Sequence, residues 1–297
     1  MRGRRTALPK RPALRRRPRD PSRGWARASL GVDLGGTKVA LGVLDASGRI
    51  LDQARIPTRA SRPAREVIDD IVEQVEGRWG SKVPGDRPLG IGVPGQVRRD
   101  GSVAFAPNLA WHDVPLRSSL ARRLGRPVEV LNDVQAATYA EWRHGAGRGA
   151  DDLVCLFVGT GVGGGIVADG RLRHGATGTA GEFGHLTVVH EGRACHCTNT
   201  GCLEAYVGGW AIAARAKEAV AQDRRRGRRL LAIAGTAASI TSETVEEAWR
   251  AGDPLARELV DETTGYLADG LVSITPPPRT IVAGSTAFTI ETRPSAR

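Results

Sequence analysis

The chain has 297 residues, of which 40% are hydrophobic and 25% are charged, a composition typical of a folded protein long enough for two domains. The formal net charge of +11 points to nucleic acid until it is located, because residues 1–27 carry +10 of it, from eleven Arg and Lys against the single Asp20. The sequence contains no run of roughly eighteen apolar residues, which excludes a membrane-spanning helix.

The basic segment at residues 1–28 is predicted to be a disordered, solvated tail. Its prolines interrupt any long helix, and no apolar run follows the charges, so neither a secretory signal nor an amphipathic transit peptide fits. Such an arm could contact nucleic acid or an anionic membrane, but we favour the solvated interpretation. We therefore expect a cytoplasmic protein with neither a membrane nor a nucleic acid as partner.

Short strands joined by glycine turns open the ordered part, where LGVDLGGTKVALGVLD and RILDQARIPT predict an antiparallel meander of three strands. Residues 63–79 have the apolar spacing of an amphipathic helix, and PLGIGVPG predicts a buried strand. Residues 128–131 predict another strand, and Asn132 is placed to cap the helix that follows. We divide the chain here, into a small α/β domain at 29–131 and a larger one at 132–297.

The second domain is predicted to begin with the strand LVCLFVG, and a hairpin, GIVADGRL, follows a glycine loop. Helices are expected at about 203–222 and about 243–272, with the arginine-rich stretch 224–229 as an exposed loop. Strands alternating with helices make an α/β protein, and a cleft between its two domains is the natural ligand site.

Two glycine loops lie at strand ends, DLGGTK at 33–38 and GTGVGGG at 159–165. Both can offer backbone N–H groups to phosphate without interference from a Cβ atom, although either loop alone could be an ordinary turn. The second contains a GxGxxG match, but a dinucleotide-binding fold requires a helix directly after the loop, and a strand follows here. Walker and protein-kinase patterns are absent, so the pair of loops predicts a different kind of ATPase.

Asn132 and Asp133 lie where a strand gives way to a helix, a position that a simple N-terminal cap also explains. In the catalytic interpretation, the Asp133 carboxylate orients an acceptor hydroxyl for phosphoryl transfer and takes its proton late. Polar side chains that could bind sugar hydroxyls occur elsewhere, and each of them alone is equally compatible with a surface or capping role. They are Asn108, Glu182, His185 and Glu204.

Three cysteines fall within eight residues, Cys195, Cys197 and Cys202, and His185 lies ten residues before the first. Three thiolates and an imidazole suit a closed, tetrahedral zinc site, which is structural because no position stays open for water. Unliganded thiols are the plain alternative, and an iron–sulfur cluster that uses Cys155 is disfavoured because Cys155 sits inside an apolar strand. We predict a structural zinc that holds His185 and Glu204 beside a sugar pocket.

Together these motifs resemble the ROK family of bacterial sugar kinases and related repressors, over about residues 30–285. DLGGTK and GTGVGGGIV are similar to its phosphate motifs, GIGVPGQV and NLAW to its sugar-side loops, and NDVQAATYAE to the segment with its catalytic aspartate. AGEFGH and CHCTNTGCLE are similar to its sugar and zinc motifs. The resemblance implies an actin-like ATPase (ribonuclease H-like) fold of two α/β domains with a cleft between them, in a homo-oligomer that uses ATP and Mg²⁺ to phosphorylate a hexose, with glucose as first candidate.

The resemblance also implies roles for individual residues. It makes Asp133 the catalytic base, and it implies sugar contacts from Asn108, Asn132, Glu182, His185 and Glu204. Nucleotide contacts are implied for the two loops and the strand TIVAG, at Asp33, Gly35, Gly36, Thr37, Lys38, Thr160, Gly161, Gly163 and Gly284. The ligands implied for structural Zn²⁺ are His185, Cys195, Cys197 and Cys202.

Three features depart from the family pattern. Thr198 stands where glycine is usual, and a β-branched residue costs roughly 1–2 kcal/mol there if φ must be positive. The adenosine-side glycine triplet reads Gly284-Ser285-Thr286, and the chain stops at Arg297, some tens of residues before relatives usually end, so we expect incomplete adenosine contacts. Three alternatives stay open: a kinase for N-acetylmannosamine or fructose, a weakly active homologue, and a sugar-sensing regulator, for whose helix-turn-helix module the tail is too short.

Overall fold

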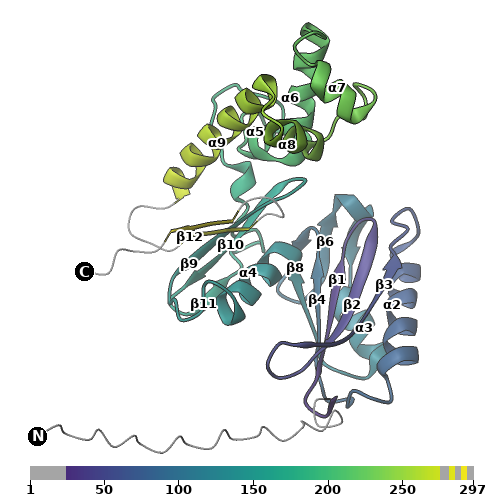
Figure 1. Cartoon of the computed structure of the whole chain (residues 1–297). Coiled ribbons are helices and arrows are strands. Elements are labelled where there is room, and N and C mark those ends of the chain that lie inside the picture. Colours follow the sequence, from purple (N-terminus) through teal and green to yellow (C-terminus); the bar gives the residue numbers. More distant parts are fainter. Residues whose placement is uncertain (1–24, 275–280, 285–288, 293–297) are drawn as a thin grey trace, which may run out of the picture.

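The computed structural model describes residues 25–274, 281–284 and 289–292, and Figure 1 shows two lobes with a helix between their sheets. Most of the predicted tail lies outside the described residues, as do Ser285 and Thr286. The end of the tail was predicted wrongly, because Ala28 is fully buried and Trp25 packs against the same core. Two apolar residues at the end of a basic segment have no periodicity that would reveal this packing.

The first lobe contains a five-stranded sheet in the order β3-β2-β1-β4-β8. The antiparallel meander that the sequence predicts is confirmed, and β4 and β8 continue the sheet in parallel from β1. Alternate residues of β2 are buried, Val39, Leu41 and Val43, as expected of a strand with one face on a core. The strands are β1 (Ser29–Leu34), β2 (Lys38–Leu44), β3 (Ile50–Pro57), β4 (Leu89–Val93) and β8 (Val128–Asn132).

The helix predicted at 63–79 is confirmed as α2 (Ala64–Trp79), which turns Val67, Ile71 and Val75 into the core of the first lobe. A second helix and a small three-stranded sheet were not predicted. Their strands have two to four residues, too few for a period to be recognised. These elements are β5 (Gln96–Val97), β6 (Val103–Ala106), the 3₁₀ turn η1 (Pro107–Leu109), β7 (Trp111–Val114) and α3 (Leu116–Leu124).

The second lobe repeats this plan, with a sheet in the order β11-β10-β9-β12-β13. Three strands again form an antiparallel meander, and β12 runs parallel to β9 as β4 does to β1. The predicted hairpin is confirmed as β10 and β11. The strands are β9 (Leu153–Val158), β10 (Val162–Ala168), β11 (Arg171–Arg173), β12 (Ile281–Gly284) and β13 (Thr289–Thr292).

The helix α4 (Asp133–His144) lies between the two sheets, as Figure 1 shows, and it packs against strands of both. Glycines allow this close approach. A Cβ atom on Gly92 of β4 would lie 3.3 Å from the Cα of Asp133, and one on Gly163 of β10 would lie 2.9 Å from Val134. The domain boundary at residues 131 and 132 stays a prediction, since α4 contacts both lobes.

A helical layer completes the second lobe (Figure 1), and its helices are shorter than predicted. The helix expected at 203–222 is interrupted at Gly208, whose backbone is extended, and the one expected at 243–272 is interrupted before Pro254. The predicted arginine-rich loop ends early, because a helix begins at Arg228 and buries Leu230. Among the described residues, no helix has the length and apolarity to cross a membrane. The helices are α5 (Glu204–Val207), α6 (Gly209–Gln222), α7 (Arg228–Ala234), α8 (Ser242–Arg250) and α9 (Pro254–Ile274).

Candidate active site

The first glycine turn joins β1 to β2, and it lies against the sugar-side loop of the same lobe. The Gly35 N–H donates to the Lys38 carbonyl at 3.0 Å, and the buried Thr58 hydroxyl donates to the Gly35 carbonyl at 2.5 Å. A Cβ atom on Gly36 would lie 3.0 Å from the carbonyl oxygen of Asn108. A side chain at Gly36 would therefore crowd this contact, which brings a predicted nucleotide residue and a predicted sugar residue together.

The polar side chains of this turn are free to meet a ligand. Asp33, Thr37 and Lys38 are exposed at the end of β1 and the start of β2, and Asn108 is exposed in η1. Their nucleotide and sugar contacts stay predictions.

The second glycine turn joins β9 to β10 and is shorter than the sequence indicated. Gly159 donates its N–H to the Gly161 carbonyl at 2.9 Å, and Thr160 is exposed between them. The predicted loop of 159–165 is wrong at its end, because β10 begins at Val162 and Gly163 lies within the strand, under Val134. Gly163 therefore has a packing role, and its contact with nucleotide stays a prediction.

Backbone hydrogen bonds from the start of α6 fix the second glycine turn. The N–H of Gly209 donates to the Gly159 carbonyl at 2.9 Å, and the N–H of Trp210 donates to the Thr160 carbonyl at 3.2 Å. Gly284 ends β12 opposite Phe157 of β9, so it reaches the same edge of the sheet as this turn. This position of Gly284 is compatible with the predicted nucleotide contact, which stays a prediction.

The end of β8 places Asn132 as the cap of α4. Its Oδ1 atom accepts from the N–H groups of Val134 and Gln135, both at 3.0 Å, and its Nδ2 donates to the Gly95 carbonyl at 3.1 Å. The capping interpretation is confirmed. A sugar hydroxyl would have to share or replace these bonds, so the predicted sugar contact of Asn132 stays a prediction.

Asp133 is the first residue of α4, between the two lobes. Its carboxylate accepts from the Val134 N–H at 2.9 Å, which favours the ionised form, but withdrawal from solvent outweighs this bond and raises the pKa of Asp133. The nearby negative charge of Asp33 raises the pKa further. A half-buried carboxylate with a raised pKa, flanked by two glycine turns, is suited to accept a proton from a ligand hydroxyl.

Glu182 precedes the short turn η2 (Phe183–His185) and His185 ends it, and both lie near Asp133 and Glu204 in the same group of charged side chains. Desolvation raises the pKa of Glu182, His185 opposes that change, and the charges of Asp133 and Glu204 add to it. The His185 Nε2 atom lies 3.9 Å from the Glu182 carboxylate, while its Nδ1 atom lies 3.8 Å from the Cys195 sulfur. One imidazole therefore faces both the carboxylate group and the cysteine segment.

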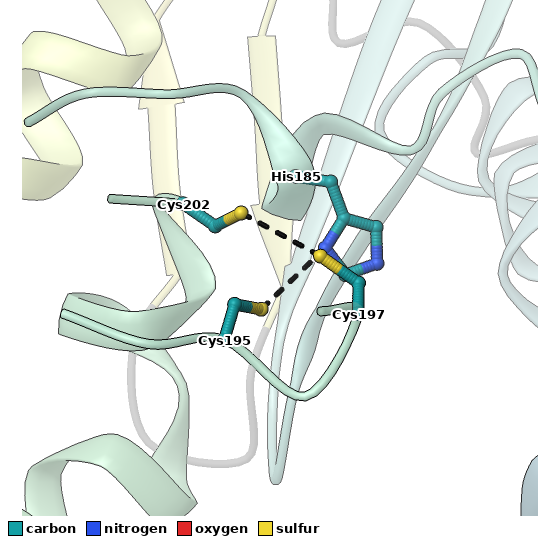
Figure 2. A group of neighbouring side chains, drawn as sticks. All are labelled: His185, Cys195, Cys197 and Cys202. Carbon is teal, nitrogen blue, oxygen red and sulfur yellow. Dashed lines mark hydrogen bonds between the residues drawn. The ribbon is translucent and has the colours of Figure 1, made fainter. Parts of the chain in front are cut away.

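Figure 2 shows the imidazole of His185 and three thiols directed toward a common centre. The ligand atoms of His185, Cys195, Cys197 and Cys202 all lie within 4.8 Å of one another, and the Cys197 and Cys202 sulfurs are 3.7 Å apart. Tetrahedral bonds of about 2.3 Å to sulfur and about 2.0 Å to nitrogen require S···S and N···S separations of about 3.8 and 3.5 Å. The donor set and its spacing fit a zinc ion. Cys155 is fully buried in β9 and is not part of the group.

In the loop that carries the cysteines, the backbone at Thr198 has the positive φ for which a β-branched residue is strained. Thr198 has a φ of +73°, so a β-branched residue occupies the left-handed region that favours glycine. Gly201 also has a φ of +73°, and a Cβ atom there would lie 1.7 Å from the Val189 carbonyl oxygen.

Glu204 joins the cysteine segment to the second glycine turn, an arrangement that the sequence did not reveal. Its carboxylate accepts from the Val162 N–H at 2.8 Å and from the Trp210 indole at 3.3 Å, and it lies 4.0 Å from the Cys195 sulfur. Trp210 in turn stacks on His196, between two of the cysteines, with ring centroids 4.0 Å apart. Glu204 thus positions the turn, and its predicted sugar contact stays a prediction.

Two glycine turns, a half-buried aspartate and a cluster of three cysteines with one histidine together make up the candidate site. The pattern of the ROK family matches residues 29–288. This chain belongs to the ROK family.

Relatives within the ROK family match most of the chain. A glucokinase from Streptomyces coelicolor is 40% identical over 263 residues, 86% of this chain and 81% of its own length. A glucokinase from Thermotoga maritima is 36% identical over 261 residues, with the same coverage of 86% and 81%. The crystal structure of a ROK family glucokinase from Streptomyces griseus, in complex with glucose and AMPPNP, superposes with a TM-score of 0.74 at 37% identity, covering 86% of this chain and 82% of that one. The expected actin-like ATPase fold is confirmed.

Proposed function

We propose that this ROK family chain is a sugar kinase that transfers the terminal phosphoryl group of ATP to glucose, forming glucose 6-phosphate. The observation that carries the proposal is the position of Asp133, at the start of the helix between the lobes. Asp33 lies close enough to raise the pKa of Asp133, and Asp133 lies close enough to raise the pKa of Glu182. Glucokinase relatives with 36–40% identity over most of the chain support the choice of substrate.

In the proposed mechanism, Asp133 accepts a hydrogen bond from the glucose 6-hydroxyl and takes its proton late, because phosphoryl transfer has a loose transition state. Orientation then contributes more than basicity, and the packing of α4 against both sheets provides it. N–H groups of the turns at Gly36 and Gly161 would donate to phosphate oxygens. Mg²⁺, when bound with ATP, neutralises phosphate charge, and Asp33 is the exposed carboxylate of the first turn that would hold it.

We assign a structural role to zinc, with His185, Cys195, Cys197 and Cys202 as its ligands, on the basis of the donor set and its spacing. Four protein ligands leave no open position, so the metal would organise the site without taking part in the reaction. His185 would then bind zinc through Nδ1 and present Nε2 toward Glu182 and the sugar. Because thiols stay available for metal in a reducing compartment, we propose a cytoplasmic location.

An ADP-release assay over a panel of hexoses, with and without ATP, tests the proposal. Glucose should support ADP release, and Asp133→Asn should abolish most of it while glucose binding, measured by calorimetry, persists. Asp86→Asn, which removes a carboxylate from an exposed loop, is the matched control and should keep full activity. Glucose binding without ADP release would favour the sugar-sensing alternative, and release only with N-acetylmannosamine or fructose would replace the substrate. That the chain forms a homo-oligomer stays a prediction, which light scattering can test.

A further inference from the structure

A cavity of about 560 Å³ lies between the lobes, and none of the residues assigned to sugar, nucleotide or metal lines it. The first lobe contributes the β5 end, the start of α3 and part of β8, and the second contributes β11 with the loop after it. Its charged and titratable side chains are Arg98, Arg99, Arg117, Glu129, Arg173 and His174. The cavity lining itself therefore carries four cations and one carboxylate, an excess of positive charge.

The positive charge is only partly compensated. Arg98 and Arg173 pair with Asp113 and Asp169, whose side chains are 73% and 86% exposed, and such exposed pairs contribute little and exchange readily. Arg117 pairs with Glu129, but its Nε atom is buried without a hydrogen-bond partner among the described residues.

Arg99 has no ion pair within the described part of the chain. The cavity therefore has unused donors for an anion.

A hydrogen-bond network fixes the histidine on the other wall. The buried Gln135 donates from Nε2 to the carbonyls of Gly178 and Ala180, at 3.2 and 3.1 Å, so its oxygen faces the His174 Nδ1 atom at 3.0 Å. Nδ1 must then carry the hydrogen in this pair, which leaves Nε2 of His174 as a hydrogen-bond acceptor for a ligand. The same loop is tied to the first lobe, since Gln96 donates to the Thr177 carbonyl at 2.9 Å.

The chemistry of the lining identifies the ligand class. Guanidinium groups match phosphate oxygens in paired hydrogen bonds, and several of them suit a dianion better than a carboxylate. The volume exceeds the needs of phosphate alone, and Val97, Val130, Leu131 and Leu172 supply an apolar wall for a carbon skeleton. We propose that this cavity binds a small organic phosphate monoester, whose phosphate group is held by Arg99 and Arg117 from one lobe and by Arg173 from the other, while the Nε2 atom of His174 accepts a hydrogen bond from a hydroxyl group of its carbon skeleton.

Such a ligand links the lobes, because its binding groups come from both. It binds the native fold only, so it also raises the stability of the protein as its concentration exceeds Kd. The binding site is separate from the reaction, and the proposal stands whether or not glucose is the substrate.

Calorimetry on the full chain tests the proposal, with glucose 6-phosphate and inorganic phosphate as probes. Glucose and AMPPNP are kept saturating, so that the active site is occupied. We expect one site per chain, with glucose 6-phosphate binding more tightly than inorganic phosphate. The double variant Arg99→Gln, Arg173→Gln should weaken both probes at least about tenfold, since it removes two charge-assisted interactions.

The variant Arg55→Gln, Arg257→Gln is the control, because it removes the same charge from exposed positions outside the cavity and should change affinity less than about twofold. Melting temperatures of both variants verify that they fold. Equal weakening in both double variants, or no binding once the active site is occupied, would overturn the site. Equal affinity for inorganic phosphate and glucose 6-phosphate would overturn the role of the apolar wall.

Discussion

Replacing Thr198 by glycine should stabilise the cysteine loop. Thr198 is exposed and has a φ of +73°, and its backbone N–H donates to the Cys195 carbonyl at 3.2 Å, a bond that glycine keeps. No hydrogen bond of its side chain is found within the described residues, so the substitution removes strain without removing a contact that balances it.

Two opposing free-energy contributions determine how much the Thr198→Gly substitution stabilises the protein. The left-handed conformation costs an ordinary residue roughly 1–2 kcal/mol, whereas glycine costs roughly 0.5–1 kcal/mol through the greater freedom of the unfolded chain. The net gain is about 0.5–1 kcal/mol for Thr198→Gly. Because three ligands of the proposed zinc site flank this residue, the same gain should appear as a zinc affinity about two- to fivefold higher.

Competition with a chelator measures the zinc affinity, and circular dichroism measures the melting temperature, which should rise by about 1–3 °C. Thr200→Gly is the matched control, since Thr200 is exposed in the same loop and is not among the residues with positive φ. Glycine there should lower stability by roughly 0.5–1 kcal/mol. If both variants change stability in the same direction, backbone strain at Thr198 is not the cause.

The remaining predictions concern the reaction and its supports. Asp133→Asn should keep glucose binding but lower kcat at least about a hundredfold, the scale of general-base groups, and a variant with half the activity would remove Asp133 from the mechanism. In the proposed mechanism activity requires ionised Asp133 and is lost as pH falls through its pKa, so the raised pKa should place the acid limb of kcat/KM above the ordinary aspartate range. Asp33→Asn should move that limb to lower pH, and an unchanged pH profile would contradict the charge coupling. Cys197→Ser should lose one zinc per chain by elemental analysis and raise both glucose and ATP KM, because Glu204 ties the cysteine segment to the second turn; finding iron would refute the site. Trp210→Phe removes the indole bond to Glu204 and should raise ATP KM more than glucose KM, in steady-state kinetics.

Local patterns predicted much of the fold, because the elements concerned are formed by neighbouring residues. The meander around Gly35 and Gly36 and the cap at Asn132 each depend on a few adjacent positions, and both are confirmed. The small sheet of β5 to β7 was missed, since its strands are too short for a period. The helix at Arg228 was missed because charge dominates its first residues, although Leu230 buries its side chain.

Among the site residues too, sequence patterns predicted the groups that are close in sequence and missed the contacts between distant segments. The spacing of Cys195, Cys197 and Cys202 is local, and the structure brings all three together with His185. The bond from Val162 to Glu204 spans 42 residues of sequence, and no pattern near either residue predicts it. Trp210 was not identified either, although a tryptophan directly after two glycines at a helix start is a sign of close packing.

The run of three glycines in β10 shows why the second phosphate loop was assigned too many residues. Side chains of a strand point alternately to opposite faces, so Gly163 and Gly165 share one face and Gly164 lies on the other. A Cβ atom on Gly163 would lie 2.9 Å from Val134, and one on Gly165 would lie 2.3 Å from Thr138, residues four apart on one side of α4.

On the other face, a Cβ atom on Gly164 would lie 2.4 Å from Phe183, the residue that follows Glu182 in the chain. The glycines that resembled a phosphate loop therefore allow α4 and the Glu182 segment to approach the same strand from its two sides. Because Gly92 of β4 gives α4 the same close approach in the first lobe, the position of Asp133 is set by backbone packing on both sheets. The proposed catalytic geometry then depends on these glycines as well as on the carboxylate, since a methyl group on Gly163 or Gly165 would press on α4 and one on Gly164 would press on Phe183.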